Sequence, residues 1–390
     1  MAVLVSWACG PTLIDRFGAA WQSLQALERR RRLGRTYQGW IKNLLPRWAT
    51  LGARLSTHLR GRLAAEAGPA WRIGGWIAFA ADGSRFDLPR TVALERAVGR
   101  CGKDGSGPQL MLTTLYHLGS GVPWSWVIQP APGDERGALV QMLGGLPDGA
   151  LLVMDAGLTG YDLLRQITES GRHFLLRVGA GVALLQKLGW AYQESGATVY
   201  LWPGHARRAG HPPLTLRLIV RGQGRKKVCL LTNLRDRNVL SDAQAGRLYR
   251  RRWGVEVFYR GLKQVMERRK LRCRTLPRAT AELDALALGA MLLGLWQMRS
   301  LLAAGQPPGR ASFAAALRVL RHAMPRPHAP GLGRTLSRCL KDLYPRRRPK
   351  AARRWPHKKK EQGPGAPRVH RATAIQLHAA QQLRARLRAA

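Results

Sequence analysis

Short apolar runs, separated by turn residues, mark the middle of the chain and predict strands. The first run, 76–81, ends at Asp82-Gly83-Ser84, a sequence typical of a turn, and a second strand is expected at 85–88. Helices with acidic or glycine-containing starts are expected at 134–143 and 160–170. The remaining predicted strands of this region are 110–118, 124–129, 150–154 and 173–178. This mixture of strands and helices is that of an α/β chain.

The pattern changes toward both ends of the chain and again after residue 180. Short β-like runs between Gly-, Pro- and Arg-rich turns predict a β-rich insertion, and helical patterns follow at 242–268 and 279–302. The tail is rich in Pro, Ala and Arg, and we expect it to be mostly flexible and basic, with a short helix near 374–388. The predicted division is a basic helical region at 1–72, core segments at 73–180 and 242–305, the insertion at 181–241 and the basic tail at 306–390.

Charge narrows the possible functions. The 390 residues include 65 Lys and Arg against 22 Asp and Glu, a formal net charge of +43. Such an excess would destabilise a compact monomer by self-repulsion and implies a polyanionic partner, most simply nucleic acid. At 45% hydrophobic residues the chain is expected to fold rather than to stay disordered.

Several classes of protein are excluded by local features. The longest apolar run, 285–296, is shorter than the ~18–20 residues of a membrane span, and residues 1–10 lack the basic start of a signal peptide. The five cysteines are scattered without a CxxC pair, and the glycine-rich stretch 99–107 lacks the spacing of a phosphate-binding loop. We therefore expect a cytoplasmic protein in a reducing compartment, without a membrane partner.

The positions of the few acidic residues indicate which of them are candidates for a functional site. Asp82 and Asp155 each follow an apolar run and are followed by glycine within two residues. In open α/β sheets, ligands bind outside the carboxyl ends of the strands, so both carboxylates are candidates for a site. The alternative is that each Asp only starts a turn.

A third acid lies in the predicted helix that starts at Asp242. Tyr249, Arg252, Glu256 and Lys263 are spaced i, i+3, i+7 and i+14, which places them on one narrow stripe. The stripe is either a solvated face with ion pairs or the lining of a cleft, and the apolar residues that crowd the same helix favour the cleft. Asp82, Asp155 and Glu256 suffice as oxygen ligands for two Mg²⁺ ions, which would stabilise the attacking and leaving oxygens of a phosphoryl transfer. Tyr249, Arg252 and Lys263 would then bind the phosphates.

At these residues the sequence resembles the DDE transposases of bacterial insertion sequences, in the family marked by a Y-(2)-R-(3)-E-(6)-K (YREK) signature. The signature stands here as YRRRWGVEVFYRGLK, and Asp82-Gly83-Ser84 and Asp155-Ala156-Gly157-Leu158 match the family's other motifs. The segments FLLR (174–177) and LTNL (231–234) also look familial. The resemblance covers roughly residues 75–300.

The resemblance implies an RNase H-like fold, in which a mixed five-stranded sheet with flanking helices brings Asp82, Asp155 and Glu256 together. It implies Mg²⁺-dependent cleavage (two ions, with Mn²⁺ as a substitute) at the ends of the insertion sequence, followed by attack of the freed 3′-hydroxyl on target DNA. A homodimer on double-stranded DNA, associated with the nucleoid, is expected. Some relatives stack a flipped base on a tryptophan, and Trp253 is one of 13 candidates.

Two alternatives stay open from the sequence. The same three carboxylates serve an RNase H-like nuclease without strand transfer, although Tyr249, Arg252 and Lys263 fit a strand-transfer site better. A basic DNA-binding protein without catalytic activity would have lost one of the acids, and none is lost here. The aromatic and basic segment 37–48 is either a reader of DNA ends or a packed amphipathic helix.

Overall fold

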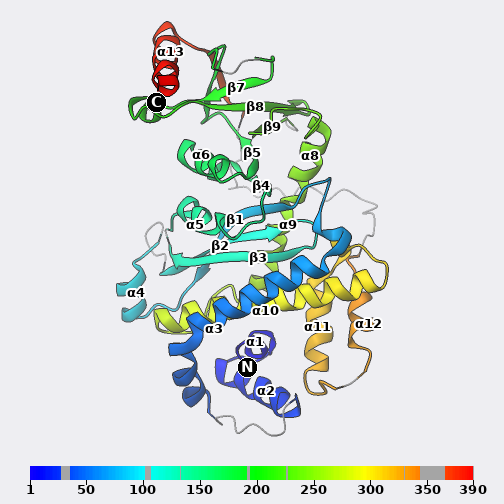
Figure 1. Cartoon of the computed structure of the whole chain (residues 1–390). Helices are drawn as coiled ribbons and strands as arrows, with labels where there is room; N and C mark the ends of the chain where they lie inside the picture. Colours follow the sequence, from blue (N-terminus) through cyan, green and yellow to red (C-terminus); the bar gives the residue numbers. More distant parts are fainter. Residues whose placement is uncertain are drawn as a thin grey trace. The chain divides into compact units, whose positions relative to one another are not determined.

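The computed structural model describes residues 1–27, 36–101, 107–131, 133–190, 194–224, 227–328, 330–342 and 365–389. The basic clusters at 29–32, 346–348 and 358–360 and the centre of the glycine-rich stretch lie outside these residues. The chain forms two compact units. The first unit contains Met1–Leu146 and Arg251–Lys341, and the second contains Pro147–Arg250 and Asp342–Ala390. Figure 1 labels most of the helices and strands of both.

The first unit is built on an antiparallel meander of three strands, β1 (Ala78–Asp87), β2 (Gln109–His117) and β3 (Val122–Pro130). The expectation that a strand stops at Asp82 and a new one starts at residue 85 is wrong, because β1 is one continuous strand. Its middle residues pair with β2, Asp82 opposite Thr114 and Gly83 opposite Thr113. This ladder satisfies the backbone groups of a sequence that alone favours a turn.

Helices cover both faces of this sheet. Helix α5 (Glu135–Leu143) packs on all three strands, while α10 (Leu276–Ala303) contacts β3 and lies beside α3 (Tyr37–Glu66) (Figure 1). The smaller helices of the first unit are α1 (Ala2–Trp7), α2 (Leu13–Leu27), α4 (Val92–Val98), α11 (Phe313–Ala323) and α12 (Leu332–Ser337), with short 3₁₀ turns at Gly68–Trp71 and Pro308–Arg310.

Helix α10 is the centre of the first unit's core. By length and composition alone, this helix of 28 residues could cross a membrane. The sequence pattern did not indicate this, because the uninterrupted apolar run 285–296 is only part of the helix. However, 67% of its most apolar window is buried inside the protein, as expected for a core helix. The buried Trp7 indole donates a hydrogen bond to the Gly289 carbonyl at 3.0 Å and so joins α1 to α10.

The second unit contains a mixed sheet of seven strands in the order β10-β6-β7-β8-β9-β5-β4. Strands β4 (Leu151–Met154) and β5 (His173–Val178) are parallel and are connected by helix α6 (Tyr161–Glu169). The predicted β-rich insertion does not form a separate small sheet, because its strands continue the β4–β5 sheet through antiparallel pairing of β5 with β9. These strands are β6 (Ala183–Gln186), β7 (Thr198–Leu201), β8 (Leu214–Arg221) and β9 (Val228–Thr232).

The C-terminal tail has more structure than the single helix that the sequence predicted. Strand β10 (Arg368–Arg371) pairs in parallel with β6, and helix α13 (Ala374–Ala389) follows it in the second unit. A five-stranded core and a β-rich insertion were both expected, and of the ten described strands β10 in the tail is the one that lies outside both predicted regions. This unit also contains helix α7 (Gly204–Arg208) and helix α8 (Asp242–Arg251), of which the last residue belongs to the first unit.

Candidate active site

Asp82 lies in the middle of β1, where its carboxyl group is partly buried. Burial, with smaller contributions from the negative charges of Glu135 and Glu256, raises the pKa of Asp82 to about 6. The charge of Arg252 and a hydrogen bond from the backbone of Gly83 oppose this rise. The ionised form of Asp82 is therefore unfavourable in the folded protein, and a bound cation would stabilise it.

Helix α9 (Trp253–Arg260) places Glu256 beside β1. The Tyr259 hydroxyl donates to the carbonyl of Asp82 at 2.6 Å and contacts that of Leu112 at 3.0 Å, which fixes α9 to both strands. Glu256 accepts from the Arg252 guanidinium at 2.6 Å. Only 10% of the Arg252 side chain is exposed, against 28% for Glu256, so this i, i+4 pair is shielded from solvent.

The helix that carries the signature is not regular. A turn at Arg252 separates α8 from α9, and a π-helical segment, Gly261–Val265, follows α9. Because a π turn is wider than an α turn, Lys263 does not lie where the ideal stripe places it.

Lys263 reaches back to β1 instead. Its ammonium group donates to the Ser84 hydroxyl at 2.8 Å and lies 5.0 Å from the centre of the Phe86 ring. Burial lowers the pKa of Lys263, although the charges of Asp87 and Asp82 oppose this. Since alternate side chains of a strand share one face, Lys263 contacts the face of β1 that also carries Asp82.

Glu135 is a carboxylate of this site that the sequence analysis did not select. It is the first residue of α5 and contacts β1 at Gly83, where a Cβ atom would lie 2.7 Å from its carboxyl carbon. Gly83 is thus needed for this close approach, and not for a turn. The acidic start of the helix at 134–143 was visible in the sequence, but its proximity to Asp82 was not.

Asp155 and Tyr249 lie in the second unit. Asp155 follows β4 directly and precedes the 3₁₀ turn Ala156–Leu158. Its carboxylate accepts from the Tyr249 hydroxyl at 3.0 Å and forms an ion pair with Arg177 at 4.0 Å. Asp82 and Glu256, by contrast, both belong to the first unit.

The donor chemistry of these residues suits magnesium, although no finished metal cage is present. Among the residues that the structure describes, no group of three or more His, Cys, Asp or Glu side chains has the arrangement of a metal site. Asp82 and Glu256 are carboxylates, the ligand type that Mg²⁺ prefers, and the charge of Glu256 raises the pKa of Asp82. A cation between them would remove that repulsion, so the residues fit the ion.

Comparison with known proteins defines the class of this chain. The family described as "Transposase DDE domain" matches residues 77–292, more than half of the chain, and the chain belongs to that family. The matched region includes all six residues selected from the sequence. The resemblance to DDE transposases of insertion sequences is thereby confirmed.

Two individual proteins are similar to this chain. The transposase InsG for insertion sequence element IS4 of Escherichia coli (strain K12) is 28% identical over 214 residues, which cover 52% of this chain and 47% of InsG. The match thus spans about half the length of that curated relative. A piggyBac transposase, solved by cryo-EM as a synaptic complex with hairpin DNA, matches with a TM-score of 0.40 and 14% identity over 69% of this chain and 58% of its own. A likeness of that size carries no argument.

Proposed function

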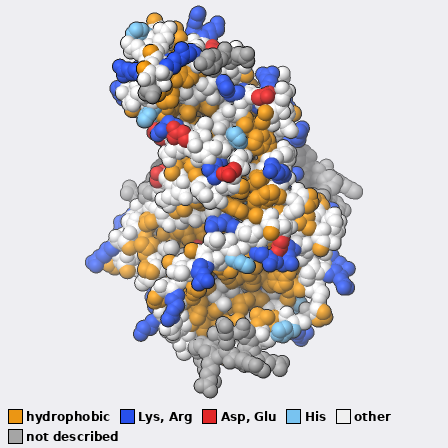
Figure 2. All heavy atoms as spheres, in the orientation of Figure 1, with side chains coloured by type: hydrophobic (Ala, Val, Ile, Leu, Met, Phe, Trp, Pro, Cys, Tyr) orange, Lys and Arg blue, Asp and Glu red, His pale blue; other side chains and the backbone are white. Residues whose placement is uncertain are grey.

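We propose that this protein catalyses DNA transposition, by cleaving DNA at the ends of an insertion sequence and joining the freed end to target DNA. The observation that carries the proposal is that Asp82, Arg252, Glu256 and Lys263 gather around β1 in a chain of the DDE transposase family. The high positive charge, +43, supports a DNA substrate. On the face drawn in Figure 2, Lys and Arg side chains are plainly more frequent than acidic ones.

We infer that Asp82, Asp155 and Glu256 together hold Mg²⁺, for which Mn²⁺ can substitute. When bound, the metal neutralises charge on the reacting phosphate and lowers the pKa of a bound water. Within the protein, Arg252 holds Glu256 in place, Lys263 stands on the Asp82 side of β1, and Tyr249 orients Asp155. Arg252, Lys263 and Tyr249 also supply the donors for DNA phosphates.

The proposed reaction has two phosphoryl transfers. In the first, water attacks a phosphorus at the transposon end, and the bond to the 3′-oxygen breaks, which leaves a 3′-hydroxyl. In the second, this hydroxyl attacks a phosphorus of the target strand, and the target's own 3′-oxygen leaves as the new bond forms. Each step breaks one P–O bond and makes one, so no external energy source is required.

The finer structural expectations belong to the same proposal. The β1–β3 meander and the parallel β4–β5 pair are the parts that would make up an RNase H-like core, to which β6–β10 are additions. A homodimer on paired DNA ends and a location in the bacterial cytoplasm, associated with the nucleoid, follow from this function.

Cleavage and strand-transfer assays on DNA bearing the element's own ends test the proposal. The wild-type protein should nick and join DNA only with Mg²⁺ or Mn²⁺, and Glu256→Gln should do neither while it still binds DNA. Glu169→Gln is the matched control, because Glu169 is an exposed acid paired with Arg165 on α6. Cleavage by Glu256→Gln would overturn the catalytic assignment. Metal-dependent nicking by the wild type without joining would favour the simple nuclease, and binding without nicking would favour a DNA-binding protein.

A further inference from the structure

A row of exposed cations follows the signature helix in the first unit. In the segment 269–274, Leu271 and Cys273 are buried, while Lys270, Arg272 and Arg274 are exposed. This alternation is that of an extended strand, so the three cationic side chains project from one side, about 6.6 Å apart along the backbone.

The backbone of this segment is firmly held. The N–H of Asp87 donates to the Arg269 carbonyl at 3.2 Å, and the N–H of Leu271 donates to the Asp87 carbonyl at 2.8 Å. From the other side, the Glu282 carboxylate accepts from the backbone N–H groups of Arg272 and Cys273 at 2.9 and 3.0 Å. The cationic side chains take no part in these bonds, so the segment displays them on a fixed frame.

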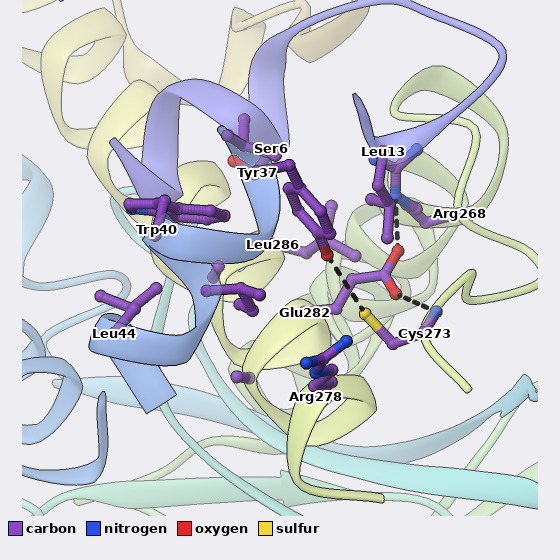
Figure 3. Close-up of a pocket in the computed structure, with 15 residues that line it drawn as sticks. Ser6, Leu13, Tyr37, Trp40, Leu44, Arg268, Cys273, Arg278, Glu282 and Leu286 are labelled. Atoms are coloured by element: carbon purple, nitrogen blue, oxygen red, sulfur yellow. Dashed lines mark hydrogen bonds and ion pairs between the residues drawn. The ribbon is translucent and has the colours of Figure 1, made fainter. Parts of the chain in front are cut away.

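Glu282 is itself anchored in the core. It forms an ion pair with Arg268 at 3.1 Å, and the two side chains are 7% and 1% exposed. Figure 3 shows this pair in a small apolar cavity, together with Tyr37, whose hydroxyl is 4.0 Å from the Cys273 sulfur. The buried acid is therefore used to hold the backbone and is not available to neutralise the exposed cations.

The cations border an open groove of about 750 Å³. Its lining includes Lys270, Arg272, Arg274 and Arg278, and no acidic residue. None of these four side chains forms an ion pair within the described part of the chain. One acid outside the lining, Asp15, lies close enough that hydrogen bonds from Thr12 and, to a lesser degree, the charge of Arg272 lower its pKa. Four cations that share one groove, with only this exposed acid described near them, repel one another, and an external anion would relieve the repulsion.

Two long helices add positive potential to the groove. Helix α3 starts at Tyr37, which lines the groove, and α10 starts at Leu276, two residues before Arg278. Neither helix has an acidic residue in its first turn. The N-terminal end of a helix carries partial positive charge, so Arg278 stands where a cation is unfavourable unless an anion binds nearby.

We propose that this groove binds the phosphate backbone of duplex DNA. The inference deepens the proposed function and rests on it. Asp82 and Asp87 are five residues apart on β1, a distance of about 17 Å, and Asp87 is bonded to the cationic segment. A duplex that runs along β1, at about 3.4 Å per base pair, would therefore meet the groove about five base pairs from the phosphate that reacts at Asp82. The role of the groove is to hold the duplex in register for the reaction.

The test compares two triple variants that lose the same charge. Lys270→Gln, Arg272→Gln and Arg274→Gln are combined in one protein. In the control, Arg208→Gln, Arg221→Gln and Arg237→Gln remove three exposed arginines of the second unit. DNA affinity is measured without metal over a range of salt concentrations. The groove variant should lose about 2–3 from the slope of log K against log salt, about 0.9 per phosphate contact, and at least 10-fold in affinity at 0.1 M salt.

Equal slopes for the groove and control variants would overturn the proposal. A second measurement uses the wild-type protein: duplex DNA should protect Lys270, but not the exposed Lys187, from acetylation. Equal labelling of Lys270 with and without DNA would also overturn it. A wild-type protein that binds DNA with no loss in the groove variant refutes only the groove, whereas a protein that binds no DNA refutes the proposed function as well.

Discussion

Asp82→Asn should make the metal-free protein more stable at neutral pH while it abolishes catalysis. Folding raises the pKa of Asp82 from 3.8 to about 6, which corresponds to about 3 kcal/mol against ionisation in the folded state. Asparagine has nearly the same shape and no charge, so it removes this cost. The new amide N–H groups lose hydration worth about 1 kcal/mol, and the expected net gain is about 1–3 kcal/mol.

The pH dependence identifies the cause. Because the folded pKa is raised, the wild type is fully stable with respect to this group below pH 4 and loses stability as the pH rises toward 6. The two proteins should therefore unfold alike near pH 4, and the variant should be more stable above pH 6. Denaturant unfolding with a chelator, followed from pH 4 to 8, measures this difference.

The control for this experiment is Asp148→Asn. The Asp148 side chain is fully exposed and pairs with Arg172 at 3.1 Å, so its replacement should give no gain at any pH. Added Mg²⁺ should stabilise the wild type and leave Asp82→Asn unchanged, because the cation needs the carboxylate. A variant that is less stable than the wild type at pH 8, or a gain that does not depend on pH, would refute the reasoning.

Three further predictions concern the signature and the tail. Arg252→Ala should lower the unfolding free energy by about 1 kcal/mol, more than the loss of an exposed ion pair would, because the Arg252–Glu256 pair is shielded from solvent. The rate of strand transfer should fall at least ~10-fold, and a normal single-turnover rate would contradict the role of Arg252 in positioning DNA. Lys263→Ala should reduce strand transfer similarly, with a thermal midpoint close to that of the wild type. Replacing the basic clusters 346–348 and 358–360 by Gln, which spares β10, should reduce the salt dependence of random-duplex binding by about 0.9 per lost contact, and an unchanged dependence would mean that the tail does not touch DNA.

The turn predicted at Asp82, which is part of strand β1 in the structure, shows where a prediction from neighbouring residues alone fails. Asp-Gly-Ser favours a turn when only neighbouring residues are considered. In the protein, Gly83 pairs with Thr113, thirty residues away, and Glu135 packs against it from α5. Neither partner can be recognised from the residues around Asp82, because both depend on how distant segments pack.

The sequence by itself led to the family, through the resemblance of its motifs to those of known transposases, and it selected the six candidate residues that those motifs contain. It also predicted most strands and helices, because hydrophobic periodicity is a local property of a chain. Only the tertiary structure decided that Glu135 lies beside Asp82, that Arg252 is shielded from water, and that Lys263 bonds to Ser84. The cationic groove was equally hidden, because the sequence shows many basic residues but not which of them lack an acidic partner. Burial and charge pairing are set by contacts between distant segments, and those contacts exist only in the folded chain.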